Sequence, residues 1–150
     1  MSRKVLYIIR GLSGSGKSSL GDAITNMIWD DSLENAKVLD KSRCWRKHYY
    51  SADDYFTDEE GNYNFNPNKL KEAHEDCQKN VERAMSLGHV QKIAVCNTFS
   101  QAWEAEPYFT LANKYDYSPF VVECQNDFGN VHGVPQETIN AMKNRWESLT

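Results

Sequence analysis

The chain has 150 residues, of which 40% are hydrophobic and 25% are charged, so a disordered or fibrous protein is excluded and one domain spanning residues 1–150 is expected. The formal charge of -4 has the wrong sign for a protein that coats nucleic acid, and any nucleic-acid contact is expected to be local. The apolar run at residues 5–9 is far too short for a membrane span and no cleavage site follows it, so we expect a cytoplasmic protein without a membrane partner.

The first part of the chain predicts a strand, a glycine turn and a helix. Residues 4–10 form a β-rich apolar run that ends at a glycine cluster, and residues 18–29 carry apolar side chains at helical spacing. Residues 30–47 are polar and mixed, and we interpret them as a connection. Residues 48–52 predict a second strand that runs into an acidic pair, and residues 57–66 have the turn chemistry of a surface loop.

The rest of the chain continues this alternation. Asn66 and Pro67 are typical of a helix start, and the helical period that follows ends at Gly88. The remaining elements are expected as a strand at 91–95, a helix at 100–115, a strand of the buried type at 118–124, and a helix from Pro135 with Ile139, Met142 and Trp146 on one side. This order predicts an α/β fold with a parallel sheet of about four to five strands, helices on both faces and ligands at the carboxyl ends of the strands.

A phosphate-binding motif lies between the first strand and the first helix. Residues 11–18 match the P-loop pattern G-x-x-x-x-G-K-[ST], whose glycines let successive backbone N–H groups point at one phosphate. Lys17 would reach the β- and γ-phosphates and the Ser18 hydroxyl would hold Mg²⁺, so ATP and Mg²⁺ are the predicted cofactors. A glycine-rich turn that binds nothing is the alternative. The predicted nucleotide-binding residues are Gly11, Leu12, Ser13, Gly14, Ser15, Gly16, Lys17, Ser18 and Ser19.

Two further strand ends supply candidate chemistry. A carboxylate at Asp53 or Asp54 can accept the proton of an attacking hydroxyl or hold Mg²⁺ through water, although a solvated acidic turn is the alternative. Cys96 and Asn97 end the third strand, where many P-loop proteins carry an Asp that orients Mg²⁺. A thiol cannot do this at neutral pH unless its pKa is depressed, so we interpret Cys96 as a packing residue. None of the four cysteines has the spacing of a zinc site or a disulfide framework.

These motifs and several others together resemble a known family. They comprise residues 11–18, 51–56, 61–63, 67, 70–74, 97–98, 103–104, 107–108 and 132–135, followed by Ile139, Met142 and residues 145–147. The chain is similar to small P-loop kinases related to the 5′-hydroxyl kinase domain of bacteriophage polynucleotide kinase. It is closer still to the AAA-type ATP-binding proteins that include the amino-terminal domain of cyclic nucleotide phosphodiesterase. The resemblance covers all but residues 30–47, and it implies that Asp53 is the general base and that residues of about 125–134 form a small lid over ATP.

Three positions depart from the family pattern. Cys96 stands where an Asp is usual, Gln101 stands near a usual arginine, and Gly129 stands where a lid arginine is usual. Related arginine fingers raise the rate of phosphoryl transfer by about 10³–10⁵. The resemblance therefore implies a substitute cation, slow transfer, or nucleotide binding with little catalysis. The candidate substitutes, each of which has a surface charge as its alternative reading, are Arg10, Arg43, Arg46, His132 and Arg145.

A basic and aromatic patch precedes the second strand. Such a mixture binds single-stranded nucleic acid through its backbone and bases, although a solvated loop with buried aromatics is the alternative. The patch consists of Lys41, Arg43, Trp45, Arg46, Lys47, Tyr49 and Tyr50. The candidate contacts to a phosphoryl acceptor are Asp54, Arg43, Arg46 and Asn97.

The sequence favours an ATP-dependent kinase that transfers the γ-phosphoryl to a hydroxyl of a nucleic-acid end or a nucleotide-like acceptor. Lys17 would neutralise the phosphates, Asp53 would be the base, and Ser18 and Asp53 would hold the metal. Within enzymes, the alternative acceptor is a hydroxymethylated base in DNA or another small hydroxyl compound. A second class of function is a nucleotide-binding regulatory or interaction protein with vestigial activity. The sequence identifies neither the acceptor nor the oligomeric state.

Overall fold

The computed structural model describes residues 3–12, 15–26, 48–125 and 134–149. They form an α/β fold around a four-stranded parallel sheet with the strand order β2-β3-β1-β4, which confirms the expected class. The strands are β1 (Val5–Gly11), β2 (Tyr49–Tyr50), β3 (Lys92–Asn97) and β4 (Ser118–Cys124). The α-helices are α1 (Lys17–Asn26), α4 (Leu70–Ser86), α5 (Ala102–Lys114) and α6 (Gln136–Asn144), and the 3-10 turns are η1 (Ala52–Phe56) and η2 (Pro67–Lys69).

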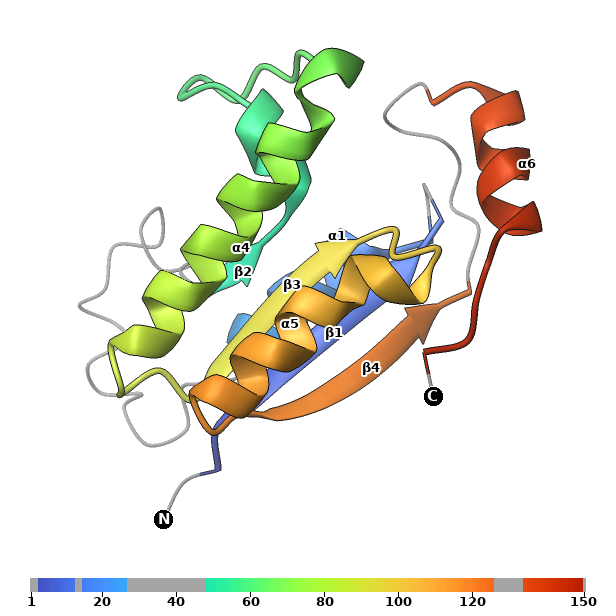
Figure 1. Cartoon of the computed structure of the whole chain (residues 1–150). Helices are drawn as coiled ribbons and strands as arrows, with labels where there is room; N and C mark the ends of the chain where they lie inside the picture. The colour runs from blue at the N-terminus through green and yellow to red at the C-terminus, as the bar shows by residue number, and fades with distance from the viewer. Residues whose placement is uncertain (1–2, 13–14, 27–47, 126–133, 150) are drawn as a thin grey trace.

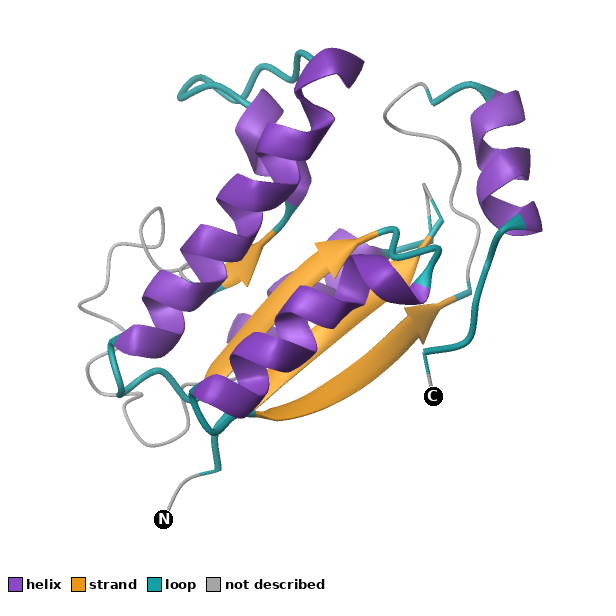
Figure 2. Ribbon diagram, viewed as in Figure 1, coloured by secondary structure: helices purple, strands orange, loops and turns teal. Residues whose placement is uncertain are grey.

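Helices cover both faces of the sheet. In Figure 1, α5 crosses in front of the strands and α1 lies behind them. The alternation of side chains along β3 divides the core accordingly. Ile93 and Val95 join the cluster made with α4 and α5, whereas Ala94 and Cys96 join the cluster that packs against α1. The arrows of β1, β3 and β4 in Figure 2 point toward one edge, which is therefore the edge where a ligand is expected.

Local sequence signals account for the start of α4. The Asn66 side chain accepts a hydrogen bond from the Asn68 N–H, and Pro67 opens η2, as the capping pattern predicts. The helix then buries its apolar stripe, and the chain leaves it at Gly88, whose φ of 82° favours glycine. The first predicted helix is observed as far as Asn26, and its expected last three positions lie outside the described residues.

Three details differ from the sequence prediction. The second strand has only two residues, because Ala52 already belongs to η1. The run in β4 is not of the buried type, and Phe120 is 49% exposed. Among the described strands β4 pairs only with β1, so it lies at the sheet edge, where helices cover it less completely. Trp146 follows the end of α6 instead of lying on that helix.

The helices in the described part of the chain are all too short or too polar to cross a membrane.

The central strand predicts where substitutions will be costly. Leu6→Ala removes a side chain that is 0% exposed, and we expect the free energy of unfolding to fall by about 2–5 kcal/mol because a cavity remains. The same change at Leu87, which is 56% exposed, serves as the matched control and should cost less than about 0.5 kcal/mol. Chemical denaturation of both variants measures the difference, and equal losses would contradict the assignment of β1 to the core.

Candidate functional site

The register of the sheet gathers the candidate residues at one edge. Arg10 is paired with Asn97 on β3, and Gly11 is paired with Cys124 on β4. The phosphate motif therefore leaves the central strand between the ends of its two neighbours. The turn η1, which carries Asp53, follows β2 on the far side of β3.

The described part of the phosphate motif is a tight turn that lies against β4. The Ser15 N–H donates to the Leu12 carbonyl over 3.1 Å, and Gly16 has a φ of 93° that favours glycine. A Cβ atom at Gly11 would lie 2.9 Å from the carbonyl oxygen of Cys124 and closer still to Ser15 Oγ, so the loop passes β4 without room for a side chain. Ser13 and Gly14 lie outside the described residues.

Lys17 folds back over this loop. Its Nζ donates to the carbonyls of Gly11 and Leu12 over 2.8 and 2.9 Å. Burial lowers the pKa of Lys17, and the nearby carboxylate of Asp53 acts in the opposite direction. The ammonium group thus lies at the loop and within electrostatic reach of the proposed base.

The phosphate loop has two groups suited to a polyphosphate and its metal. Ser15 Oγ is buried and has no hydrogen-bond partner among the described residues. Such an oxygen is costly to bury alone, and a phosphate oxygen would satisfy its O–H. The Ser18 hydroxyl, an oxygen ligand of the type that Mg²⁺ prefers, lies 3.1 Å from the hydroxyl of Tyr49.

The two adjacent aspartates do different things. The Asp54 carboxylate accepts the Ser51 N–H over 3.2 Å and completes a capping box at the start of η1. Asp53 is exposed, and its Oδ1 accepts the Tyr63 hydroxyl over 3.3 Å. Burial and the neighbouring Asp53 carboxylate raise the pKa of Tyr63 to about 12, so the phenol keeps its proton and can donate.

Asn97 connects β3 to this turn. Its Oδ1 accepts the Ala52 N–H over 2.9 Å and lies 3.4 Å from Ser51 Oγ. Its Nδ2 faces the Cys77 sulfur at 3.9 Å. Asn97 is buried and holds the backbone of η1, so this side chain supports the turn that presents Asp53 instead of reaching for an acceptor.

Arg10 is not available as a substitute for a lid arginine. Its guanidinium is buried, donates to the Phe99 carbonyl over 2.6 Å and lies 3.6 Å from a carboxylate oxygen of Glu123. The ring of Trp146 covers it at 4.0 Å. The expectation that Arg10 can turn toward a phosphate is therefore wrong, because these partners hold its buried guanidinium at the end of β1.

The other expected cations divide into two groups. Arg145 is exposed, and its Nε donates to Ser100 Oγ over 3.0 Å, beside the start of α5. Arg43, Arg46 and His132, like Gly129 and most of the expected lid, lie outside the described residues. Of the basic and aromatic patch, the structure describes only Tyr49 and Tyr50. Tyr49 is buried against α1, which excludes base stacking by its ring in this structure.

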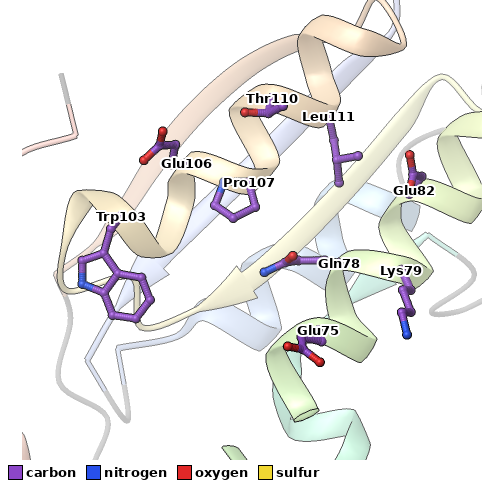
Figure 3. A pocket seen from close by; sticks show the side chains of 9 residues that line it. All are labelled: Glu75, Gln78, Lys79, Glu82, Trp103, Glu106, Pro107, Thr110 and Leu111. Atoms are coloured by element: carbon purple, nitrogen blue, oxygen red, sulfur yellow. The ribbon is translucent and has the colours of Figure 1, made fainter. Parts of the chain in front are cut away.

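Two hollows lie near these elements. A cavity of about 310 Å³ adjoins the phosphate loop through Leu12 and is lined also by Glu123, Cys124, Gln125, Lys143 and Trp146. A larger groove of about 490 Å³ runs between α4 and α5 and has Trp103 at one end (Figure 3). No residue of the phosphate loop or η1 lines that groove, so size alone does not mark the reactive centre.

Sequence reasoning missed the surroundings of Asp53. Tyr63 reaches it from the loop after η1, and His74 on α4 is half-buried within electrostatic range of both Asp53 and Glu104. Glu104 in turn accepts the Ser100 hydroxyl and the Gln101 N–H at the start of α5. Spacing along the chain gives no signal for these contacts, because they join separate elements.

Known proteins share features with this chain. It is 31% identical over 152 residues to NEDD4-binding protein 2 of Homo sapiens, covering 95% of this chain but only 8% of that protein. A candidate kinase from Chloroflexus aurantiacus superposes with a TM-score of 0.50 at 16% identity, covering 83% of this chain and 60% of its own. A chain of the Pnkp1/Rnl/Hen1 complex superposes with a TM-score of 0.51 at 14% identity, covering 94% and 39% respectively. No family model matches the chain. The structural likeness establishes the fold, which is that of P-loop kinases.

The environment of His74 predicts a dependence of stability on pH. Burial lowers the pKa of His74 in the folded chain, although Glu104 and Asp53 oppose this effect. Below the unfolded value of about 6.5 the unfolded chain then binds the additional proton, so acid favours unfolding. We expect the free energy of unfolding to fall as the pH drops from about 7 toward the folded pKa, by at most about 1.4 kcal/mol per pH unit from this group.

His74→Gln should reduce that dependence, whereas His89→Gln, at an exposed position, should leave it unchanged. Denaturant titrations between about pH 5 and 8 compare the three proteins. An unchanged slope in His74→Gln would show that groups other than His74 set the acid sensitivity.

Proposed function

We propose that the chain is an ATP-dependent kinase that transfers the γ-phosphoryl group to a hydroxyl of a nucleic-acid end or a nucleotide-like acceptor. The observation that carries the proposal is that a cation and a carboxylate lie close together although they follow different strands. Lys17 lies over the loop of the phosphate motif, and the carboxylate of Asp53 is exposed within its electrostatic reach. A cation for the phosphates beside a base for the acceptor is what phosphoryl transfer to a hydroxyl requires.

The chain's own residues then divide the work. Lys17 and the loop N–H groups bind the phosphates, and Ser18, with Asp53 through water, would hold Mg²⁺. The metal would neutralise charge that develops on the phosphates. Asp53 takes the proton of the acceptor hydroxyl, whose oxygen forms the new bond to the γ-phosphorus while the bond to the β,γ-bridging oxygen breaks and ADP leaves. The Tyr63 hydroxyl holds the Asp53 carboxylate in place.

Exposed aromatic rings support an acceptor that carries a base. Tyr55 is 41% exposed two residues after Asp53, and Phe65 is 51% exposed and packs edge-on against Phe56. Trp103, at the start of α5, is 66% exposed. Bases stack on such rings, which contribute about 1–3 kcal/mol each in single-strand binding. The likeness to a chain of the Pnkp1/Rnl/Hen1 complex, which includes a polynucleotide kinase, adds weight to the same acceptor class.

The nucleoside end of ATP has a candidate site in the cavity of about 310 Å³ beside Leu12. Its lining combines the aliphatic Leu12, the Trp146 indole and the Lys143 ammonium group. These groups suit a flat base and the hydroxyls of a ribose.

A second function has specific support. Phe99 and Glu123 hold the Arg10 guanidinium away from the loop, and Cys96 has a thiol where a carboxylate commonly orients the metal. Both features favour slow phosphoryl transfer. If transfer is negligible, the chain would be a nucleotide-binding regulatory protein whose partners distinguish its nucleotide-bound and nucleotide-free forms. A hydroxymethylated DNA base or a small hydroxyl compound remains the alternative acceptor for the kinase.

Incubation with γ-labelled ATP and a panel of acceptors tests the proposal. The panel contains 5′-hydroxyl oligonucleotides, DNA with hydroxymethylated bases, and nucleosides, and we expect label on the oligonucleotides. Lys17→Ala should lose transfer and most ATP binding, measured by calorimetry, because the phosphates lose their nearest cation. Label on the modified DNA alone would favour the alternative acceptor. ATP binding without transfer would favour the binding protein, and binding of neither ATP nor GTP would contradict the site itself.

Asp53→Asn and Asp54→Asn form a matched pair. We expect Asp53→Asn to lower turnover by about 10²-fold or more with ATP affinity nearly intact, which is the range for losing a general base. Asp54→Asn keeps an oxygen that can accept the Ser51 N–H, so both turnover and stability should stay close to wild type. Steady-state kinetics with the best acceptor measures both, and a dead Asp54→Asn beside a normal Asp53→Asn would reverse the roles.

A further inference from the structure

Tyr49 makes a contact that the proposed mechanism does not use. Its hydroxyl donates to Ser18 Oγ over 3.1 Å, across 31 residues of sequence. The ring is buried in the cluster that packs against α1. The phenol thus places a hydrogen-bond donor beside the serine that would hold the metal.

The space for this ring is created by two small residues. A Cβ atom at Gly21 would lie 2.5 Å from Tyr49 Cε2 and 2.7 Å from the sulfur of Cys96. Gly21 follows Ser18 by three positions, so both residues lie on the same side of α1. The glycine on α1 and the compact Cys96 side chain at the end of β3 thus leave room for the Tyr49 ring to pack against α1. In this position its hydroxyl lies within hydrogen-bond distance of Ser18.

We propose that Tyr49 is a positioning residue that holds the Ser18 hydroxyl in the orientation required to bind Mg²⁺. This inference rests on the proposed function only as far as binding of a magnesium nucleotide. In P-loop proteins a carboxylate commonly shares the metal with the loop serine or threonine, and at the end of β3 this chain has Cys96. The hydrogen bond restricts rotation of the Ser18 hydroxyl and leaves its oxygen a lone pair for the cation. Tyr49 is thus an outer partner that orients a metal ligand.

A purely structural role for Tyr49 makes a different prediction. If the phenol only fills space in the core, loss of its oxygen changes binding of ATP equally with and without metal. If the phenol orients Ser18, loss of its oxygen weakens ATP binding in the presence of Mg²⁺ and leaves metal-free ATP binding unchanged. The ratio of ATP affinities measured with Mg²⁺ and with a chelator therefore separates the two roles.

The test compares Tyr49→Phe with Tyr50→Phe by calorimetry of ATP binding under both conditions. Tyr50 is the matched control, because successive residues of a strand face opposite sides and its ring packs with the other cluster. We expect Tyr49→Phe to weaken ATP binding in Mg²⁺ by about five-fold, the effect of one hydrogen bond, and to leave metal-free binding within about two-fold. Tyr50→Phe should leave the ratio unchanged.

A second variant tests the route of the effect. Gly21→Ala should push the ring away from Ser18 and lower the same ratio, and the double variant Gly21→Ala/Tyr49→Phe should lose no more than the larger single loss. An unchanged ratio in Tyr49→Phe, or an equal loss with and without Mg²⁺, would overturn the proposal while wild-type binding left the nucleotide site standing. Wild-type ATP binding that Mg²⁺ does not strengthen would overturn both this role and the proposed metal.

Discussion

The position of β1 between two parallel neighbours is the constraint on which the rest of the structure depends. Its residues pair with β3 on one side and β4 on the other over nearly their whole length. The side chains of Leu6, Ile8 and Ile9 are fully buried, two in one core cluster and one in the other. Because both faces and both edges of the strand are fixed, the loop that follows Gly11 leaves the sheet in a fixed direction. Lys17 and Ser18 acquire their positions from that direction.

The turn η1 gives the two adjacent aspartates different contacts. The Ala52 N–H donates to the Asn97 side chain and the Ser51 N–H donates to the Asp54 carboxylate, and these bonds hold the turn at the end of β2. Asp54 caps the turn, and its neighbour Asp53 accepts the Tyr63 hydroxyl. Two residues of identical chemistry receive separate roles from a single turn.

The elements with local signals could be predicted from the sequence, and the contacts between them could not. The phosphate motif, the start at Asn66 and Pro67 and the α/β alternation depend on neighbouring residues, and the structure has the corresponding elements. The exposure of Phe120 depends on strand order, which periodicity does not contain. The separate surroundings of Asp53 and Asp54 depend on Tyr63 and Ser51, and their catalytic roles remain predictions. Tyr49 looked like a candidate for base stacking because nothing in the local pattern indicates which face of a two-residue strand is covered.

The burial of Arg10 has a consequence for the order in which a nascent chain can fold. This residue leaves the ribosome just before the phosphate loop, yet its partners Phe99, Glu123 and Trp146 are synthesised far later. A guanidinium without these partners is costly to bury. We therefore expect Arg10 to stay exposed to water until the partners have been synthesised. The sheet then closes around its central strand only after these residues have been made. A growing chain would therefore carry the complete nucleotide motif for some time before it could offer a finished pocket.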